Sequence, residues 1–451
     1  MRIKLSCKLT LEEIARAVRG RLSSENATVS YVVTDSRTAE NGDLFIALKG
    51  DSFDGNDYIR EASAKGAFTL GAADDATVKA DSGECALLRL AHYYRKHKLK
   101  RLKHTVAITG SVGKTTTKEF LAQMLSVAAS VHKTPQNMNN TVGLPLTVLS
   151  APEDAEILIL EMGMNHPREI GLLSKCAEPD LAIITNIGTA HIGNLGSRQA
   201  IARAKSEITA GLTGRLITPY DEPLLGGLTS YRFGINDLRA DMSLSHTDTG
   251  VKITESSNES FVCDFFSSDE RSLRCLAPAI CAMRLLKYDK STISVGVSSI
   301  SDQNIRQKII SVNSITLICD FYNASPESFS AAIRVLAEMN APSNRCVLIG
   351  DMLELGSYSD RAHRELGALA ARLGIDKIFA FGKWANAVEK GAVSSDFPTE
   401  SFFKNGEISR PDITAKQVLR HCIAGDTVLL KASRGIGLER VVDAMITLAK
   451  E

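Results

Sequence analysis

An α/β architecture with three domains is predicted by three features of the sequence. At 451 residues the chain exceeds what one hydrophobic core normally serves, so two to four domains are expected. Apolar strands alternate with helical segments in two separate stretches, which favours parallel sheets covered by helices. Between one of these strands and the next helix lies the glycine-rich turn Gly110-Ser-Val-Gly-Lys-Thr115, a pattern typical of phosphate-binding loops.

The first domain is expected over residues 1–103, and it combines helix and strand patterns. Leu11–Val18 has the apolar spacing of a helix. Asp43–Leu48 is a candidate strand, because it is apolar and is bounded by Gly42 and Gly50. We therefore predict a small α/β domain at the N-terminal end.

The central domain is expected over residues 104–308. Its strands alternate with helices, which predicts a parallel sheet, and they are Val106–Thr109, Glu156–Glu161, Leu181–Asn186 and Leu216–Thr218. Residues 226–300 show no clear periodicity and contain polar runs such as Ser256-Ser-Asn-Glu-Ser260.

The third domain is expected over residues 309–451, where the alternation of strands and helices starts again. The predicted strands are Ile315–Cys319, Cys346–Ile349, Lys377–Phe381 and Thr427–Lys431, and the last helix is Leu438–Ala449. This arrangement predicts a doubly wound, Rossmann-like domain.

Composition excludes several classes of protein. The 53 Lys and Arg residues balance 52 Asp and Glu residues, so the net charge gives no reason to expect nucleic-acid binding. The nine cysteines are scattered and odd in number, with no Cys-x-x-Cys pair, which favours reduced thiols in the cytoplasm. Residues 1–20 contain charged side chains and no stretch approaches the length of a membrane span, so we expect neither a signal peptide nor membrane insertion.

The turn Gly110–Thr115 carries the clearest chemical signal. Glycines let backbone N–H groups converge on phosphate oxygens, and a helix N-terminus adds a favourable dipole. Lys114 is suited to the β- and γ-phosphates, and the hydroxyl of Thr115 or Thr116 to Mg²⁺, which points to ATP. Ile108 occupies the leading glycine position of the longer motif, and an ordinary glycine turn is the alternative interpretation.

Further candidates follow the ends of predicted strands, where ligands collect in open parallel sheets. Glu161 is predicted to bind Mg²⁺, with capping of the next turn as the alternative. His191 could bind a metal or phosphate, although a single histidine is more often structural. Lys205 is predicted from charge alone to be an exposed helix lysine, because an ammonium group would be repelled by Mg²⁺.

Two more strand ends belong to the third domain. Asp320 is followed by Tyr322-Asn-Ala-Ser-Pro326, whose tyrosine and asparagine could contact a nucleoside. Lys431-Ala-Ser-Arg-Gly435 precedes the last helix, where its cations and helix N–H groups would suit a carboxylate. Polar capping of a strand-to-helix turn is the alternative for both.

Taken together, these segments resemble the Mur ligases, the ATP-dependent amide ligases of peptidoglycan synthesis. The resemblance covers nearly the whole chain, in order, through Thr34–Arg37, Gly42–Gly50, Asp54-Gly55, Thr109–Glu119, Thr134–Pro145, Glu161–Gly163, Thr185–His191, Arg306, Asp320–Pro326, Gly350–Gly356, His363 and Lys431–Arg434. The asparagine-rich loop Thr134–Pro145 and the stretch Gly350–Gly356 make the chain most similar to the ligases that join D-alanyl-D-alanine to UDP-N-acetylmuramoyl-tripeptide.

The resemblance implies a role for each domain and for named residues. The first domain would bind the UDP-sugar through Asp35, Ser36 and Arg37, with further substrate contacts from Asn139 and Asn140. The central P-loop domain and the far side of the ATP site would bind nucleotide through Gly110, Ser111, Val112, Gly113, Lys114, Thr115, Thr116, Asn186, Arg306, Asp320 and Asn323. The third domain would hold the incoming dipeptide through Lys431 and Arg434.

The same resemblance implies a two-step reaction with two magnesium ions. ATP would phosphorylate the terminal carboxylate of the substrate, and the amine of the dipeptide would then displace phosphate from the acyl phosphate. Thr115 and Glu161 would hold one Mg²⁺, and His191 and a carbamylated Lys205 a second. Residues expected to take part in catalysis are Lys114, His191, Lys205 and Asp320.

The sequence departs from the family pattern in one segment above all. Ser272 and Cys275 stand where asparagines that contact adenine are expected, and Pro278 is predicted to interrupt the helix there unless the helix begins at Pro278. Cys319 replaces the first member of a common acid pair, and Ala432 replaces a glycine. Two alternatives therefore stay open, a sister ligase that adds another amino acid and a catalytically weakened member with a binding role. A monomer is expected.

Overall fold

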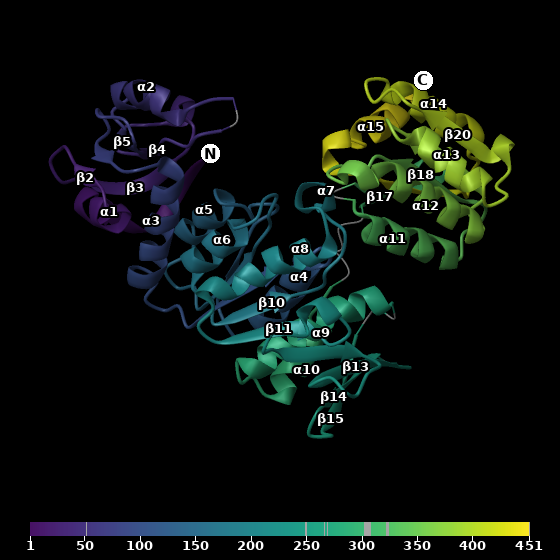
Figure 1. Cartoon of the computed structure of the whole chain (residues 1–451), viewed down its shortest axis with the longest axis horizontal. Coiled ribbons are helices and arrows are strands. Elements are labelled where there is room, and N and C mark those ends of the chain that lie inside the picture. Colours follow the sequence, from purple (N-terminus) through teal and green to yellow (C-terminus); the bar gives the residue numbers. More distant parts are fainter. Residues whose placement is uncertain are drawn as a thin grey trace. The chain divides into compact units, whose positions relative to one another are not determined.

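A computed structural model describes residues 1–50, 52–248, 250–265, 267, 269–301, 308–321 and 324–450. Two of the predicted nucleotide contacts, Arg306 and Asn323, lie outside the described residues. The chain divides into two compact units, of which unit 1 is Met1–Asn186 with Ala202–Ser301, and unit 2 is Ile187–Ile201 with Asp302–Glu451. Unit 1 contains two sheets and unit 2 one, coloured from purple through yellow along the sequence in Figure 1.

The first sheet of unit 1 has six strands in the order β1-β3-β4-β5-β6-β2. They are β1 (Arg2–Thr10), β2 (Arg21–Leu22), β3 (Thr28–Val33), β4 (Leu44–Ile46), β5 (Phe68–Gly71) and β6 (Val78–Lys79), joined by helices α1 (Leu11–Val18), α2 (Ile59–Ala64) and α3 (Gly83–His97). The predicted helix at Leu11 is confirmed, and it begins at a capping box in which Thr10 and Glu13 each accept the other's backbone N–H.

The second sheet of unit 1 has nine strands in the order β15-β14-β13-β12-β11-β10-β7-β9-β8. They are β7 (His104–Thr109), β8 (Val131–Lys133), β9 (Ile157–Glu161), β10 (Leu181–Ile184), β11 (Arg215–Pro219), β12 (Tyr231–Ile235), β13 (Met242–Thr247), β14 (Gly250–Glu255) and β15 (Ser260–Asp264). The seven strands from β8 to β13 are parallel, as the central segments predict. The last two, β14 and β15, add antiparallel pairs from the region that showed no clear periodicity.

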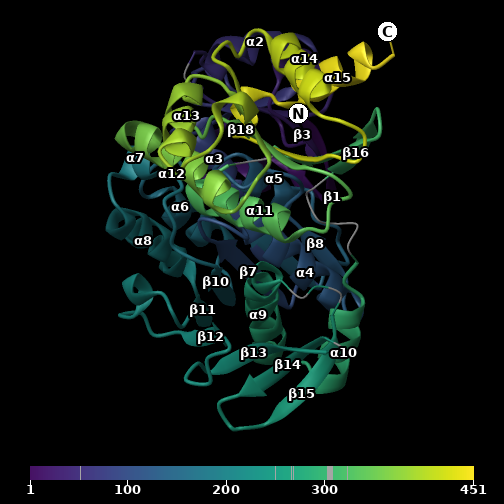
Figure 2. The same ribbon diagram turned by 90° about the vertical axis from the view of Figure 1, so that its right-hand side faces the viewer.

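Helices cover both faces of the second sheet. Apolar side chains of α4 (Lys114–Ser126), α9 (Glu270–Leu285) and α10 (Lys290–Ser298) form one core with the strands, and Figure 2 shows α9 and α10 beside β13 to β15. On the other face lie α5 (Gly143–Leu149) and α6 (Glu169–Ala177), which also contact α3 of the first sheet. Helix α8 (Arg198–Ser206) continues from unit 2 into unit 1.

The predicted interruption at Pro278 is wrong. Helix α9 runs without a break through Pro278, although a proline has no N–H group to donate to the carbonyl four residues earlier. Pro278 is buried among the apolar residues Leu276, Ala277 and Ala279, so tertiary packing of this helix outweighs the lost hydrogen bond.

Unit 2 contains a six-stranded sheet in the order β16-β17-β21-β18-β19-β20. Its strands are β16 (Lys308–Val312), β17 (Ile315–Asp320), β18 (Arg345–Gly350), β19 (Lys377–Phe381), β20 (Phe402–Asn405) and β21 (Thr427–Lys431), and all except β16 are parallel. The helices of this unit are α7 (Ile192–Leu195), α11 (Pro326–Glu338), α12 (Ser359–Arg372), α13 (Ala385–Val393), α14 (Pro411–His421) and α15 (Glu439–Leu448). This confirms the predicted doubly wound arrangement.

Helices α14 and α15 pack on one face of this sheet, where their apolar residues share a core with the strands. Helices α11, α12 and α13 contact one another and form the other layer, as Figure 1 shows. Among the described residues, no helix has both the length and the apolar character needed to cross a membrane.

Candidate active site

The phosphate loop joins the end of β7 to the start of α4. Gly110 has a φ of 149°, and a Cβ atom there would lie 1.9 Å from the Thr185 hydroxyl, so only glycine fits. Gly113 caps α4 with a φ of 83°. The first hydrogen bond of the helix runs from the N–H of Thr117 to the carbonyl of Gly113 at 2.8 Å. The backbone N–H groups before Thr117 therefore lie outside the hydrogen bonds of the helix itself. This arrangement suits a phosphate group.

Asn186, predicted to bind the cofactor, lies against the loop and holds it in shape. Its Oδ1 accepts the N–H groups of Ser111 at 3.1 Å and Val112 at 2.9 Å, and its Nδ2 donates to the Val112 carbonyl at 3.0 Å. Thr185 adds a hydrogen bond from its hydroxyl to that same carbonyl at 2.6 Å. The Lys114 amine donates to the Gly110 carbonyl at 2.9 Å, across the mouth of the turn.

Glu161 ends β9 beside this loop and is 2% exposed. One carboxylate oxygen accepts the Thr115 hydroxyl at 2.6 Å, and the other accepts the Asn139 side-chain amide at 2.9 Å. Burial alone would raise the pKa of Glu161, but the charges of Lys114 and Lys118 and these two hydrogen bonds hold it below its ordinary value. The carboxylate is therefore kept ionised inside the protein.

Lys118 is a residue of this site that the sequence analysis missed. Its side chain is fully buried, its amine donates to the Thr134 carbonyl at 2.7 Å, and it lies 3.7 Å from a Glu161 oxygen. Lys118 follows Thr115 by three residues, and residues i and i+3 lie on the same face of a helix. This spacing is the feature of the sequence that could have placed Lys118 in the site.

These residues fit a magnesium ion. Thr115 and Glu161 present a hydroxyl and an ionised carboxylate at hydrogen-bond distance from each other, and Mg²⁺ prefers such oxygen ligands. Asn139, a predicted substrate contact, donates its side-chain amide to the Glu161 carboxylate. The Asn140 side chain accepts the N–H of Gly143, the first residue of α5, at 2.7 Å.

The prediction that Lys205 is an exposed lysine is wrong. It lies on α8 with 2% of its surface exposed, on the face that also buries Ile201, Ala202 and Ala204. Burial, and then the positive charge of Lys114, lower its pKa well below the ordinary value. A buried amine without its proton is the form that can react with carbon dioxide, so the position fits the carbamate that the resemblance implies.

In unit 2, His191 precedes α7 and contacts a glutamate that the sequence analysis did not single out. His191 has a φ of 65°, and its Nδ1 lies 2.5 Å from a carboxylate oxygen of Glu354. The Gly193 N–H donates to the Glu354 carbonyl at 3.0 Å, and the Thr189 N–H donates to the Glu327 carboxylate at 2.6 Å. Two acids of unit 2 therefore hold the segment that carries His191.

Asp320 and Lys431 were assigned to different ligands, but the structure pairs them with each other. They occupy matching positions at the ends of the parallel strands β17 and β21. The Lys431 amine donates to the Asp320 carboxylate at 2.8 Å, and the lysine side chain is 3% exposed. Arg434, three residues later, starts a short 3₁₀ turn and is exposed.

The three predicted UDP-sugar residues lie in one turn of the first sheet's domain. Asp35 caps the turn Ser36–Thr38 and pairs with Arg37 at 2.8 Å, which lowers the pKa of Asp35 to about 2. The Arg37 side chain is 82% exposed. The Ser36 hydroxyl donates to Glu61 at 3.2 Å.

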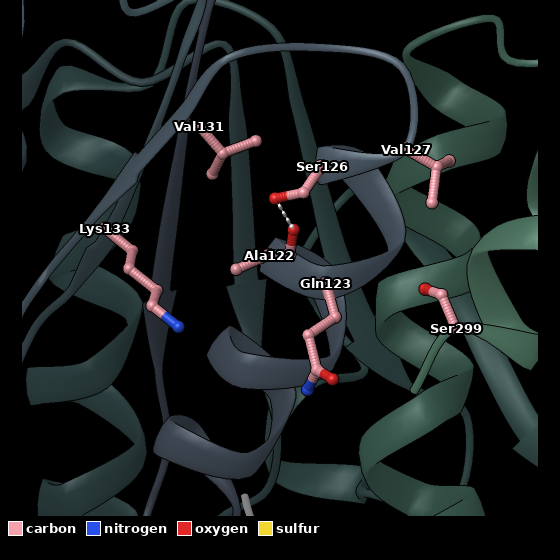
Figure 3. A pocket seen from close by; sticks show the side chains of 7 residues that line it. All are labelled: Ala122, Gln123, Ser126, Val127, Val131, Lys133 and Ser299. Atoms are coloured by element: carbon pink, nitrogen blue, oxygen red, sulfur yellow. Dashed lines mark hydrogen bonds between the residues drawn. The ribbon is translucent and has the colours of Figure 1, made fainter. Parts of the chain in front are cut away.

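The departure at Ser272 and Cys275 lies close to the phosphate loop. Ser272 donates its N–H and its hydroxyl to Asp269, the residue that caps α9. The Cys275 sulfur lies 3.9 Å from the Gly113 carbonyl oxygen. A cavity of about 340 Å³ at the opposite end of α4, lined by residues such as Gln123, Val131 and Lys133, includes none of the predicted site residues (Figure 3).

Comparisons with known proteins point to one family. Three family models match, described as "Mur ligase family, catalytic domain" over residues 28–102, "Mur ligase middle domain" over 108–274 and "Mur ligase, glutamate ligase domain" over 305–434. The UDP-N-acetylmuramoyl-tripeptide–D-alanyl-D-alanine ligase of Bacillus subtilis (strain 168) is 35% identical, with 97% of this chain and 98% of the relative covered.

Solved structures are similar over the same length. MurF from Acinetobacter baumannii gives a TM-score of 0.85 at 28% identity and covers 99% of this chain and 100% of its own. MurF from Thermotoga maritima, solved in complex with ADP, gives 0.77 at 30% identity and covers 93% of this chain and 97% of its own. These matches confirm the predicted α/β fold class. With the phosphate loop and the strand-end residues in place, they show that the chain belongs to the Mur ligase family.

Proposed function

We propose that this chain joins D-alanyl-D-alanine to UDP-N-acetylmuramoyl-tripeptide at the expense of ATP, in peptidoglycan precursor synthesis. The observation that carries the proposal is the buried Glu161 carboxylate at the end of β9, which accepts the hydroxyl of Thr115 at 2.6 Å. Thr115 lies at the start of α4, the helix that follows the phosphate loop. The relatives at full length are named for this activity, and one solved neighbour carries ADP.

The chain's own residues account for the main physical obstacle. A carboxylate and a triphosphate repel one another, so cations must neutralise charge that develops during phosphoryl transfer. Lys114 would move from the Gly110 carbonyl to the phosphates, while the N–H groups at the start of α4 bind phosphate oxygens. Asn186 holds the loop in shape by accepting the N–H groups of Ser111 and Val112.

Magnesium would be held by Thr115 and Glu161, and it would supply charge neutralisation on the phosphates. Asn139 and Lys118 orient Glu161, because they contact its carboxylate oxygens. The family resemblance extends the proposal to a second ion held by His191 and a carbamylated Lys205.

The substrate contacts are likewise part of the proposal. Asp35, Ser36 and Arg37 would face the UDP-sugar, and Lys431 and Arg434 the carboxylate of the dipeptide. Asp320 would exchange its contact with Lys431 for one with nucleotide when ligands bind. The protein is proposed to act as a cytoplasmic monomer.

A phosphate-release assay with the purified full chain tests this function. We expect release that requires ATP, Mg²⁺, UDP-N-acetylmuramoyl-tripeptide and D-alanyl-D-alanine together. Equal rates with single amino acids in place of the dipeptide would contradict the proposal and indicate a sister ligase that adds another amino acid. The altered segment around Ser272 and Cys275 supports another candidate, a catalytically weakened member with a binding role. No turnover by folded protein at millimolar ATP would favour that candidate.

A further inference from the structure

Two cysteines of unit 2 lie next to each other although they are far apart in the sequence. Cys346 is the second residue of β18 and is fully buried, and Cys422 follows α14 and is 6% exposed. Their sulfur atoms are 4.0 Å apart. Cys346 lies near the amino end of the parallel strands, whereas Asp320 and Lys431 end theirs, so the pair is remote from the proposed dipeptide site.

A carboxylate completes the cluster, which at first resembles a metal site. Ligand atoms of Cys346, Cys422 and Asp426 all lie within 4.8 Å of one another. Two thiols and a carboxylate are ligands that zinc can use. The contacts of Asp426 decide whether these three side chains are available to a metal ion.

Asp426 is already fully engaged. One of its oxygens accepts the backbone N–H and the side-chain amide of Asn344, at 3.0 and 2.8 Å. The other accepts the Ile423 N–H at 3.0 Å and the Lys377 amine at 3.1 Å. A metal ion would have to displace the lysine and remain beside its positive charge, which Coulomb repulsion opposes. The cluster therefore favours chemistry between the two sulfur atoms.

We propose that Cys346 and Cys422 form a redox pair, which a hydroperoxide converts to a disulfide. The more exposed Cys422, as thiolate, attacks one oxygen of hydrogen peroxide, and the O–O bond breaks to give a sulfenic acid and, after protonation, one water. The Cys346 sulfur then attacks the Cys422 sulfur, the S–O bond breaks, and a second water leaves with the Cys346 proton. Two thiols are oxidised by two electrons and the peroxide is reduced.

The environment supports this order of events. The Lys377 amine donates to Asp426 at 3.1 Å and also interacts with both cysteines, so a cation borders the pair. The hydrogen bond shared with Cys422, in which the Cys346 S–H donates once Cys422 is a thiolate, and then burial raise the pKa of the Cys346 thiol, so Cys346 keeps its proton until the second step. The product is neutral and suits the apolar core that both sulfur atoms share.

The bond would act on the stability of unit 2. It would tie β18 to the end of α14 and close a loop that contains α12, α13, β19 and β20, and a long loop gives a large restriction of the unfolded chain. We expect the Tm of unit 2 to rise by about 5–15 °C on oxidation, with little change in ligase rate.

Mass spectrometry on the full chain tests the pair directly. Protein treated with hydrogen peroxide is unfolded with an alkylating agent and digested, and we expect peptides with Cys346 and Cys422 to be joined and lighter by two hydrogen atoms. Dithiothreitol should reverse the link. Alkylation of both cysteines after peroxide treatment, or their linkage to other cysteines, would overturn the proposal.

Variants and a metal control separate redox chemistry from the alternatives. Cys422→Ser should abolish the link and the rise in Tm, whereas Cys319→Ala, a matched loss of a buried cysteine in the same core, should leave both in place. If a variant folds poorly, the disulfide-linked peptides from the peroxide-treated wild type still decide whether the pair forms. Stoichiometric binding of Zn²⁺ by the reduced wild type, lost in Cys422→Ser, would replace the redox pair with a metal site.

Discussion

The phosphate-loop side of unit 1 and the strand ends of unit 2 hold their predicted site residues differently. In unit 1, Thr115 and Glu161 already face each other, and buried neighbours fix the carboxylate in its ionised form. In unit 2, Lys431 is occupied by Asp320 and His191 by Glu354. The proposed magnesium ligands of unit 1 therefore already face each other, whereas Lys431 and His191 of unit 2 contact acidic residues of their own unit.

The largest expected effect is the loss of Lys114. Lys114→Ala removes the cation that would stabilise charge on the transferring phosphate, so kcat should fall by roughly a hundredfold or more. Steady-state phosphate release measures this change. Lys290→Ala, which removes a lysine paired with Glu259 on the surface, is the control. An unchanged rate in Lys114→Ala would show that Lys114 takes no part in catalysis. It would also contradict the view that unit 1 holds the phosphate site.

Glu161 tests whether unit 1 is organised around a negative charge. Glu161→Gln should raise the Mg²⁺ concentration needed for half-maximal activity by about tenfold or more, because a charged metal ligand is lost. It should also lower the free energy of unfolding by about 3 kcal/mol, since Lys118 loses a buried partner.

A double variant separates those two effects. Glu161→Gln with Lys118→Met removes both buried charges, so denaturant unfolding should show stability partly regained while the Mg²⁺ requirement stays high. Recovery of normal Mg²⁺ dependence in this variant would contradict a metal role for Glu161.

The Asp320–Lys431 pair sharpens the view of unit 2. Lys431→Met should raise the KM for D-alanyl-D-alanine by about tenfold with a smaller change in kcat, if the lysine leaves Asp320 to bind the dipeptide. A double-mutant cycle with Asp320→Asn measures their coupling in the free protein, expected at about 0.5–3 kcal/mol. Zero coupling in the unfolding free energies would show that the pair does not form in solution.

The smallest effect is expected at Glu354. Its side chain is 44% exposed, so its contact with His191 should contribute at most about 1 kcal/mol to stability. Glu354→Gln should therefore change the unfolding free energy little and kcat by less than about fivefold. Arg361→Gln, which removes an exposed partner of Glu365, serves as the matched control. A loss of kcat as large as that of Lys114→Ala would give Glu354 a direct part in the reaction.

The sequence alone was sufficient for features that depend on neighbours in the chain. The phosphate loop, the strands that precede Glu161 and Lys431, and the helix at Leu11 follow from local periodicity and from the glycine-rich turn. These features predict the fold class, and their order along the chain carries the family resemblance.

Only the tertiary structure decided which charges are buried and which side chains meet. Lys205 follows a charged stretch of helix, yet the packing of α8 buries it. Lys118 of α4 contacts Glu161 of β9, although the two residues are far apart in the sequence. Pro278 stays inside a helix because its neighbours bury an apolar face. Burial and pairing at a distance depend on how sheets and helices pack, and local sequence patterns do not contain that information.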